Sequence, residues 1–121
     1  MLMLRTKKFR FKNHFLSKRN ELRVEIVNHC SWKGALSLCE IASFLKNSTP
    51  FTFVLSEGMD EDHFFLSFVD CNGIVKHKNV RILRVQSNWV IKNGTGNYHF
   101  SIESLIPDCL HCSASVCKPF A

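Results

Sequence analysis

The sequence lacks the long apolar run that a membrane-spanning helix requires. No segment reaches about 18 consecutive apolar residues, which excludes such a span. The apolar start, residues 1–4, is too short for the core of a signal peptide and is followed at once by basic residues. We therefore expect a protein that is not secreted and that resides in the cytoplasm.

Acidic residues are scarce at the N-terminal end, and the whole net positive charge of the chain lies there. Residues 1–28 carry eight Lys or Arg and two Glu, whereas residues 29–121 carry eight residues of each sign. The remainder of the chain therefore has no net charge and no basic stripe of its own. Because 121 residues suit one domain, we predict a basic N-terminal extension over residues 1–28 and one domain over residues 29–121.

The basic extension leaves several interpretations open. Its Lys and Arg residues are interleaved with Phe9, Phe11 and Phe15, which is compatible with an arm, a partial helix, or an extra strand at residues 22–27. Its charge could bind the phosphates of nucleic acid, bind anionic lipid headgroups, or remain solvated.

Motifs for catalysis or metal binding are missing. The chain has six Cys, and because we expect it not to be secreted, free buried thiols are favoured over disulfides. The densest group of possible metal ligands falls within nine residues: Cys109, His111, Cys112 and Cys117. It lacks the second, distant ligand pair that a zinc site prefers. His63 and His77 have no nucleophile motif around them. We predict no catalytic residue, no metal and no cofactor, and therefore not an enzyme.

Two helices are expected from capping and periodicity. Ser37 is a suitable N-cap with Glu40 as its capping-box partner, and apolar residues follow at helical spacing up to residue 45. Ser101 can cap a second helix from Ile102 to about Cys112, with Pro107 favouring a late start or a kink.

Between these helices the sequence predicts an antiparallel meander. Residues 51–55, 63–69, 73–83 and 88–92 are rich in β-forming residues, and an Asn-Gly turn signal at 72–73 separates the second from the third. The fold class we expect is α+β, a central antiparallel β-sheet flanked by two α-helices.

Short motifs in this order resemble the Src homology 2 family. The family opens with Trp, Gly and then a Ser that starts the first helix, has a Phe-Leu-Val-Arg strand, a Leu-Ser-Val strand and a Val-Lys-His strand, and enters its second helix with a Phe and a Ser. The matching segments, spread from Trp32 to about Cys117, are Trp32, Gly34 and Ser37, Ala42 and Leu45, residues 53–56, residues 66–68, Val75-Lys76-His77, residues 80–82 and residues 100–106. The resemblance implies a domain that binds phosphotyrosine peptides in a basic pocket beside the sheet.

The departures from the family concern the phosphate itself. Ser56 stands where the Arg of Phe-Leu-Val-Arg grips the phosphate, and Leu38 stands where a second Arg usually follows the helix-starting Ser. Each charge-assisted hydrogen bond contributes about 1.5–3 kcal/mol, so losing the Arg fork weakens phosphate binding by roughly two orders of magnitude. The next loop adds repulsion because its charges are acidic: Glu57, Asp60, Glu61 and Asp62.

The function we expect is a non-catalytic adaptor or regulatory interaction domain in intracellular signalling, with weak or absent ordinary phosphotyrosine binding. Its partner is a protein or peptide, phosphorylated or not, rather than a small-molecule substrate. We expect the peptide to cross the sheet, perpendicular to its strands, near Ser56, Lys76, His77, Lys78 and Arg81.

Three alternatives stay open. One is a phosphotyrosine reader in which Lys76, His77 and Lys78 take over from the missing arginines. Another is a structural docking domain, which would expose apolar residues around Phe64, Phe65 or Trp89. The last is nucleic-acid or membrane binding through residues 1–28.

Overall fold

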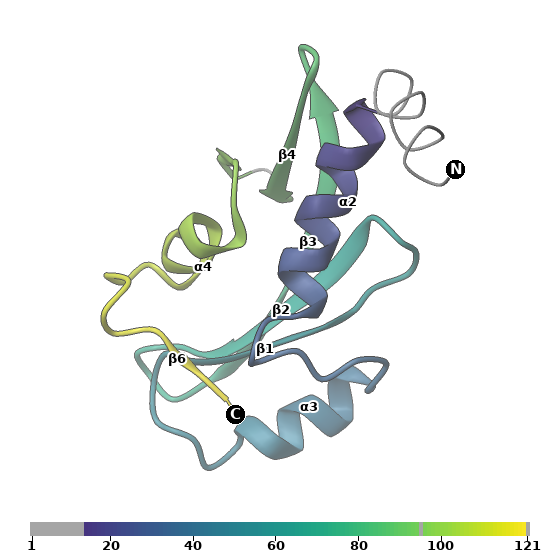
Figure 1. The fold of residues 1–121 in the computed structure, drawn as a ribbon. Coiled ribbons are helices and arrows are strands. Elements are labelled where there is room, and N and C mark those ends of the chain that lie inside the picture. Colours follow the sequence, from purple (N-terminus) through teal and green to yellow (C-terminus); the bar gives the residue numbers. More distant parts are fainter. Residues whose placement is uncertain (1–13, 95, 121) are drawn as a thin grey trace.

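The strand-forming segments of the sequence assemble into one six-stranded sheet. The computed structural model describes residues 14–94 and 96–120. The helices are α2 (His14–Val27), α3 (Leu38–Leu45) and α4 (Ile102–Leu110). The strands are β1 (Thr52–Glu57), β2 (His63–Val69), β3 (Val75–Val85), β4 (Asn88–Asn93), β5 (Tyr98–His99) and β6 (Lys118–Pro119). Helices α2 and α4 cover one face of this sheet, and α3 lies beyond β1 on the other (Figure 1).

The predicted α+β class and the antiparallel meander are confirmed. The strand order is β5-β4-β3-β2-β1-β6, and β1 to β4 pair as consecutive antiparallel neighbours. The short strand β6 pairs with β1 in parallel, which makes the sheet mixed at this edge. A segment before α3 also lies alongside β1, since Trp32 forms a parallel bridge with Leu55. The sequence did not predict these two edge pairings.

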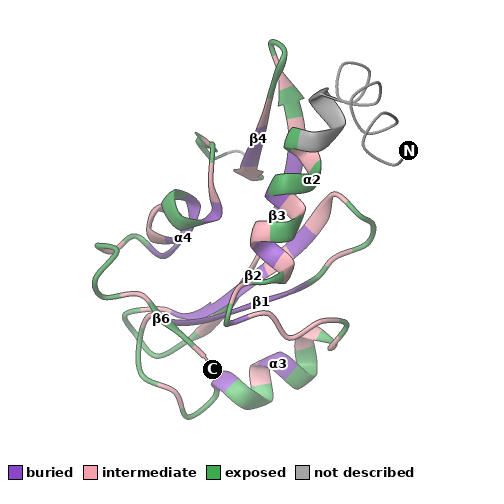
Figure 2. Cartoon of the chain, in the orientation of Figure 1, coloured by how far each residue is buried: buried purple, intermediate pink, exposed green. Residues whose placement is uncertain are grey.

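Strand β1 is buried on both faces and separates two apolar cores (Figure 2). Because side chains alternate along a strand, Phe53 and Leu55 enter the larger core, which α2 and α4 cover. Val54 faces the other way and packs with Ile41 and Leu45 of α3. The position of a residue in β1 therefore decides which helix it meets.

Helix α3 begins where its capping signal predicts. The Ser37 Oγ accepts a hydrogen bond from the Glu40 N–H at 3.1 Å, and the Glu40 carboxylate accepts one from the Ser37 N–H at 3.2 Å. This capping box pairs two backbone donors that the first helical turn leaves without partners. Both the helix and its first residue, Leu38, are confirmed.

Helix α2 is the largest addition to the predicted fold. Of the structures considered for the extension, a partial helix is found over residues 14–27, and the strand at residues 22–27 is wrong. Leu22 and Ile26, one helical turn apart, are 2% and 0% exposed and belong to the larger core. The basic residues of the extension before residue 14 lie outside the described part of the chain.

Helix α4 starts directly after its predicted cap and ends sooner than predicted. Ser101 Oγ accepts a hydrogen bond from the Ser104 N–H at 3.2 Å, so Pro107 does not delay the start. The helix ends at Leu110 rather than near Cys112 because His111 adopts a left-handed backbone, with φ of 56°. Glu25 of α2 also accepts a hydrogen bond from the Ile102 N–H at 2.8 Å, which caps α4 from the neighbouring helix.

Candidate functional site

The register of β3 divides the predicted peptide-binding residues between the two faces of the sheet. His77 pairs with Ser67 and Arg81 pairs with His63, so these side chains project toward the α3 side, as Ser56 does. Their neighbours in the strand project the other way. The α3 side therefore brings together Ser56, His77 and Arg81, and not the two lysines.

Lys76 and Lys78 lie on the face that α4 covers. They pair with Phe68 and Leu66, two residues of the larger core. Lys76 Nζ forms an ion pair with Asp70 Oδ2 at 3.4 Å. Both lysines line a pocket of about 240 Å³ that also contains Leu110 of α4. A phosphate beside Ser56 is therefore separated from both lysines by the thickness of the sheet.

Ser56 itself is sealed inside the sheet. Its side chain has no exposed surface, and its Oγ forms no hydrogen bond with any described residue. Its register partner on β2 is Phe65, which is half-buried. The residue at the phosphate-gripping position of the resembled motif thus offers no group to a ligand in solution.

Ser67 and His77 form a close pair on the same face. The distance from Ser67 Oγ to His77 Nδ1 is 2.6 Å, and desolvation lowers the pKa of His77. The hydrogen bond fixes the orientation of the ring. Ser67 has no exposed surface, so its hydroxyl cannot reach a substrate as a nucleophile. The pair is suited to shaping a binding surface.

The acidic loop after β1 is held by helix α2. Arg19 Nε donates to Asp62 Oδ1 at 2.8 Å, and Arg19 Nη2 donates to Glu61 Oε2 at 3.1 Å. Arg23 Nε donates to the carbonyl oxygen of Glu61 at 3.0 Å. In the same loop, Asp60 Oδ1 lies 2.7 Å from His63 Nδ1, and this contact lowers the pKa of Asp60. Arg19 and Arg23 of α2 therefore compensate part of the negative charge of the acidic loop.

The Arg19–Asp62 contact predicts a measurable coupling between α2 and the loop. We expect a double-mutant cycle of Arg19→Ala and Asp62→Ala, followed by urea unfolding, to give a coupling energy of about 0.5–1 kcal/mol. Lys18→Ala in the same cycle is the control, because Lys18 pairs within its own helix with Glu21. Equal coupling for Arg19 and Lys18 with Asp62 would contradict the contact.

The cysteines are all free thiols, but only some are buried. Cys109 is buried, Cys112 and Cys117 are half-buried, and the other three are exposed, so the predicted burial is wrong for those three. Burial raises the pKa of Cys109 to about 11. Cys112 Sγ and Cys117 Sγ lie 3.2 Å apart, and burial and this thiol neighbour raise the pKa of Cys117 to about 12. Within residues 14–94 and 96–120, no three possible ligands gather around a metal-sized site.

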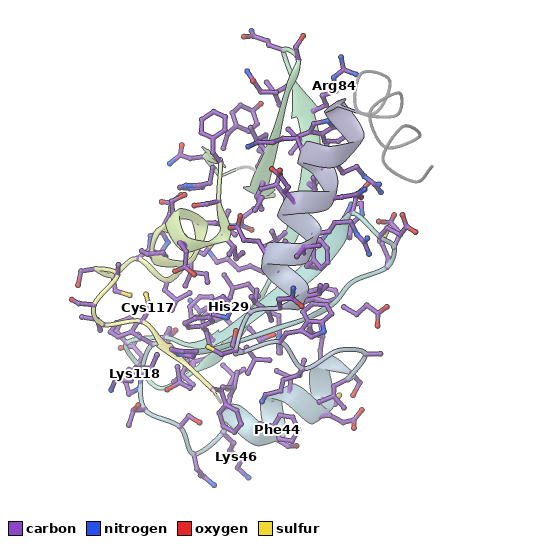
Figure 3. The ribbon with its side chains drawn as sticks, viewed as in Figure 1. His29, Phe44, Lys46, Arg84, Cys117 and Lys118 are labelled. Carbon is purple, nitrogen blue, oxygen red and sulfur yellow. The ribbon has the colours of Figure 1, made fainter. Side chains whose placement is uncertain are left out.

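One pocket had no signal in the sequence. A cavity of about 280 Å³ lies among the end of α2, helix α4 and the segment before β6, and His29 and Cys117 line it (Figure 3). His29 Nδ1 accepts a hydrogen bond from the Ser31 N–H at 3.1 Å, and its Nε2 lies 3.6 Å from Glu103 Oε1. No motif surrounds His29, and only the packing of distant segments creates this pocket.

Comparisons with known proteins support the fold and nothing finer. No family model matches the chain, and no curated protein matches it. Thirty-seven chains of solved structures match. One of them is CED-2, with a TM-score of 0.53 and 14% identity over 73% of this chain, which spans 52% of the CED-2 chain. The shared fold is compatible with the Src homology 2-like arrangement. None of the described helices is long and apolar enough to cross a membrane.

Proposed function

We propose that this chain is a non-catalytic protein-interaction domain, an adaptor or regulatory module of intracellular signalling that binds a peptide segment of a partner protein. The observation that carries the proposal is the complete burial of Ser56. At the position where the resembled motif has its phosphate-gripping Arg, the side chain is sealed in β1 and its hydroxyl has no partner among the described residues.

The proposal includes weak or absent binding of ordinary phosphotyrosine peptides. Ser56 cannot supply the two charge-assisted hydrogen bonds of an arginine fork. Leu38, at the second basic position, is an apolar, half-buried first residue of α3. What remains on this face is a surface around His77 and Arg81 that suits an unphosphorylated peptide or a permanent protein partner.

The alternatives fit less well with the positions of their residues. A phosphotyrosine reader using Lys76, His77 and Lys78 would need one phosphate to reach both faces of the sheet. For the docking-domain alternative, Phe64 is buried, and Phe65 and Trp89 are half-buried, so the expected exposed apolar surface is absent at these three residues. For binding through the extension, Arg19 and Arg23 are already engaged with the acidic loop.

A peptide-library titration tests the proposal. The full chain is titrated with a degenerate tyrosine-peptide library, with and without phosphorylation. We expect members of the unphosphorylated library to bind, and phosphorylation at the tyrosine to raise affinity less than about tenfold. A second test is the variant Ser67→Ala, which removes the hydroxyl that orients His77. This variant is expected to weaken peptide binding. Binding of the phosphorylated library alone, at affinities lost on Lys76→Ala and Lys78→Ala, would overturn the proposal.

A further inference from the structure

His63, Arg81 and Lys92 form a row of basic side chains across three neighbouring strands. His63 of β2 pairs with Arg81 of β3, and Arg81 pairs with Lys92 of β4. Directly paired residues of adjacent strands project from the same face of a sheet. Together with Asn79 and Gly94 these three residues line one pocket of about 300 Å³.

The two permanent charges of this row, Arg81 and Lys92, are not neutralised by carboxylates of the described residues. No ion pair joins Arg81 or Lys92 to an acidic side chain within residues 18–94 and 96–120, and residues 1–13 contain no Asp or Glu. The third member of the row, His63, does have an acidic partner, since its Nδ1 lies 2.7 Å from Asp60 Oδ1. Other basic residues of the described chain, such as Arg19 and Lys76, do have acidic partners.

The arrangement has an energetic cost without a ligand. Like charges directly opposite each other in an antiparallel pair destabilise it, and Arg81 and Lys92 are such a pair. Lys92 Nζ lies 4.9 Å from the centre of the Tyr98 ring, a contact that fixes the ammonium group and leaves its charge in place. An anion between the two side chains would turn the repulsion into two attractions.

The pocket also has the donors that an anion needs. Arg81 offers a planar fork that matches two oxygens of a carboxylate or a phosphate, and Lys92 offers a point charge. The Asn79 amide adds a neutral donor from the same face of β3. These donors stand on paired strands rather than on a loop, so their spacing is set before a ligand arrives.

We propose that this pocket binds an anionic group of the peptide partner, the carboxylate of an acidic side chain or the phosphate of a phosphorylated one. The inference rests on the proposed function, since it gives that peptide its chemistry. Asn79 and His77 project from the same face of β3, so the pocket continues the surface on which the peptide is expected to lie. The site for the anion is thus displaced from Ser56 toward the β3–β4 end of the sheet.

A charge-removing double variant tests the anion site. Arg81→Gln with Lys92→Gln is compared with Lys46→Gln with Lys118→Gln, an equal change of charge at two exposed residues near α3 and β6 (Figure 3). The first probe is inorganic phosphate, followed by amide chemical shifts in the full chain. We expect shifts at residues 79, 81, 92 and 94 that disappear in the first variant and persist in the second. Equal shifts in both variants would overturn the proposal.

Peptide pools then separate the anion site from the proposed function. Three pools carry glutamate, phosphoserine or glutamine at one fixed position, and the pool that gains affinity identifies carboxylate or phosphate as the source. The double variant at 81 and 92 should weaken its binding about tenfold or more and leave the glutamine pool unchanged. Undiminished binding by that variant overturns the anion site alone. If no pool binds while phosphate still shifts the site, the proposed peptide function fails and the anion site stands.

The stability of the double variant at 81 and 92 provides a control for its folding. Removal of the Arg81–Lys92 repulsion should leave the free energy of unfolding unchanged or slightly higher. A loss of phosphate binding in a variant that unfolds at the wild-type urea concentration therefore reports the site and not the fold. A strong loss of stability would contradict the repulsion on which the proposal is built.

Discussion

Replacing Ile26 by alanine is expected to lower the free energy of unfolding by about 2–5 kcal/mol, as large-to-small substitutions in well-packed cores do. Ile26 has no exposed surface and packs in the larger core with residues of β1 to β4 and α4. The substitution removes apolar area from that core and leaves a cavity bordered by rigid strands. Urea unfolding of the full chain measures the effect.

Val24→Ala provides the control within the same helix. Val24 is 51% exposed, and alanine is the better helix former, so we expect little change or a slight gain in stability. Similar losses at positions 24 and 26 would mean that α2 does not pack on the sheet as described. A small loss at both would mean that the sheet is stable without this helix.

This packing changes how the N-terminal extension can be tested. Deletion of residues 1–28 removes Leu22, Ile26 and the Glu25 carboxylate that accepts the Ile102 N–H. A loss of nucleic-acid or lipid binding after such a deletion would report unfolding as readily as a lost charge. Charge-neutralising substitutions before residue 14 are the cleaner way to examine that alternative.

The sequence predicted those elements whose signals are local. The capping box of Ser37 and Glu40 fixes the start of α3 from four consecutive residues, and it is present in the structure. Strand β2 was predicted with both of its ends, because apolar β-forming residues fill it and polar residues border it. The meander followed because its short connections allow only neighbouring strands to pair.

The elements that were missed depend on contacts between distant segments. Leu22 and Ile26 stand at helical spacing, but they are surrounded by charges, and only packing against the sheet shows that they are core residues. Strand β6 has two residues and exists because it pairs with β1. The split of Lys76 and Lys78 from His77 follows from strand alternation and was available in the sequence. The row of Arg81 and Lys92 needed the β3–β4 register, which no local signal provides.

Introducing arginine at position 56 is expected to damage the fold rather than to create phosphate binding. Ser56 has no exposed surface, and the pocket on this face is lined by other residues further along β3 and β4. An arginine there must overpack the space between β1 and α3 and bury a charge without a carboxylate partner. We expect Ser56→Arg to lower the free energy of unfolding by about 3 kcal/mol or more and to leave phosphotyrosine affinity unchanged.

Ser56→Ala is the matched control, because it changes the residue at position 56 without adding volume or charge. The Ser56 hydroxyl is buried without a partner among the described residues, so its removal should leave stability unchanged or raise it by about 1 kcal/mol. A stable Ser56→Arg protein that gains about a hundredfold in phosphotyrosine affinity would mean that a phosphate pocket is open at this position and lacks only the arginine. An unstable Ser56→Arg protein beside a stable Ser56→Ala protein would mean that the surrounding core has no room for a long side chain at this position. The search for a ligand then belongs at Arg81 and Lys92, on the open part of the same face.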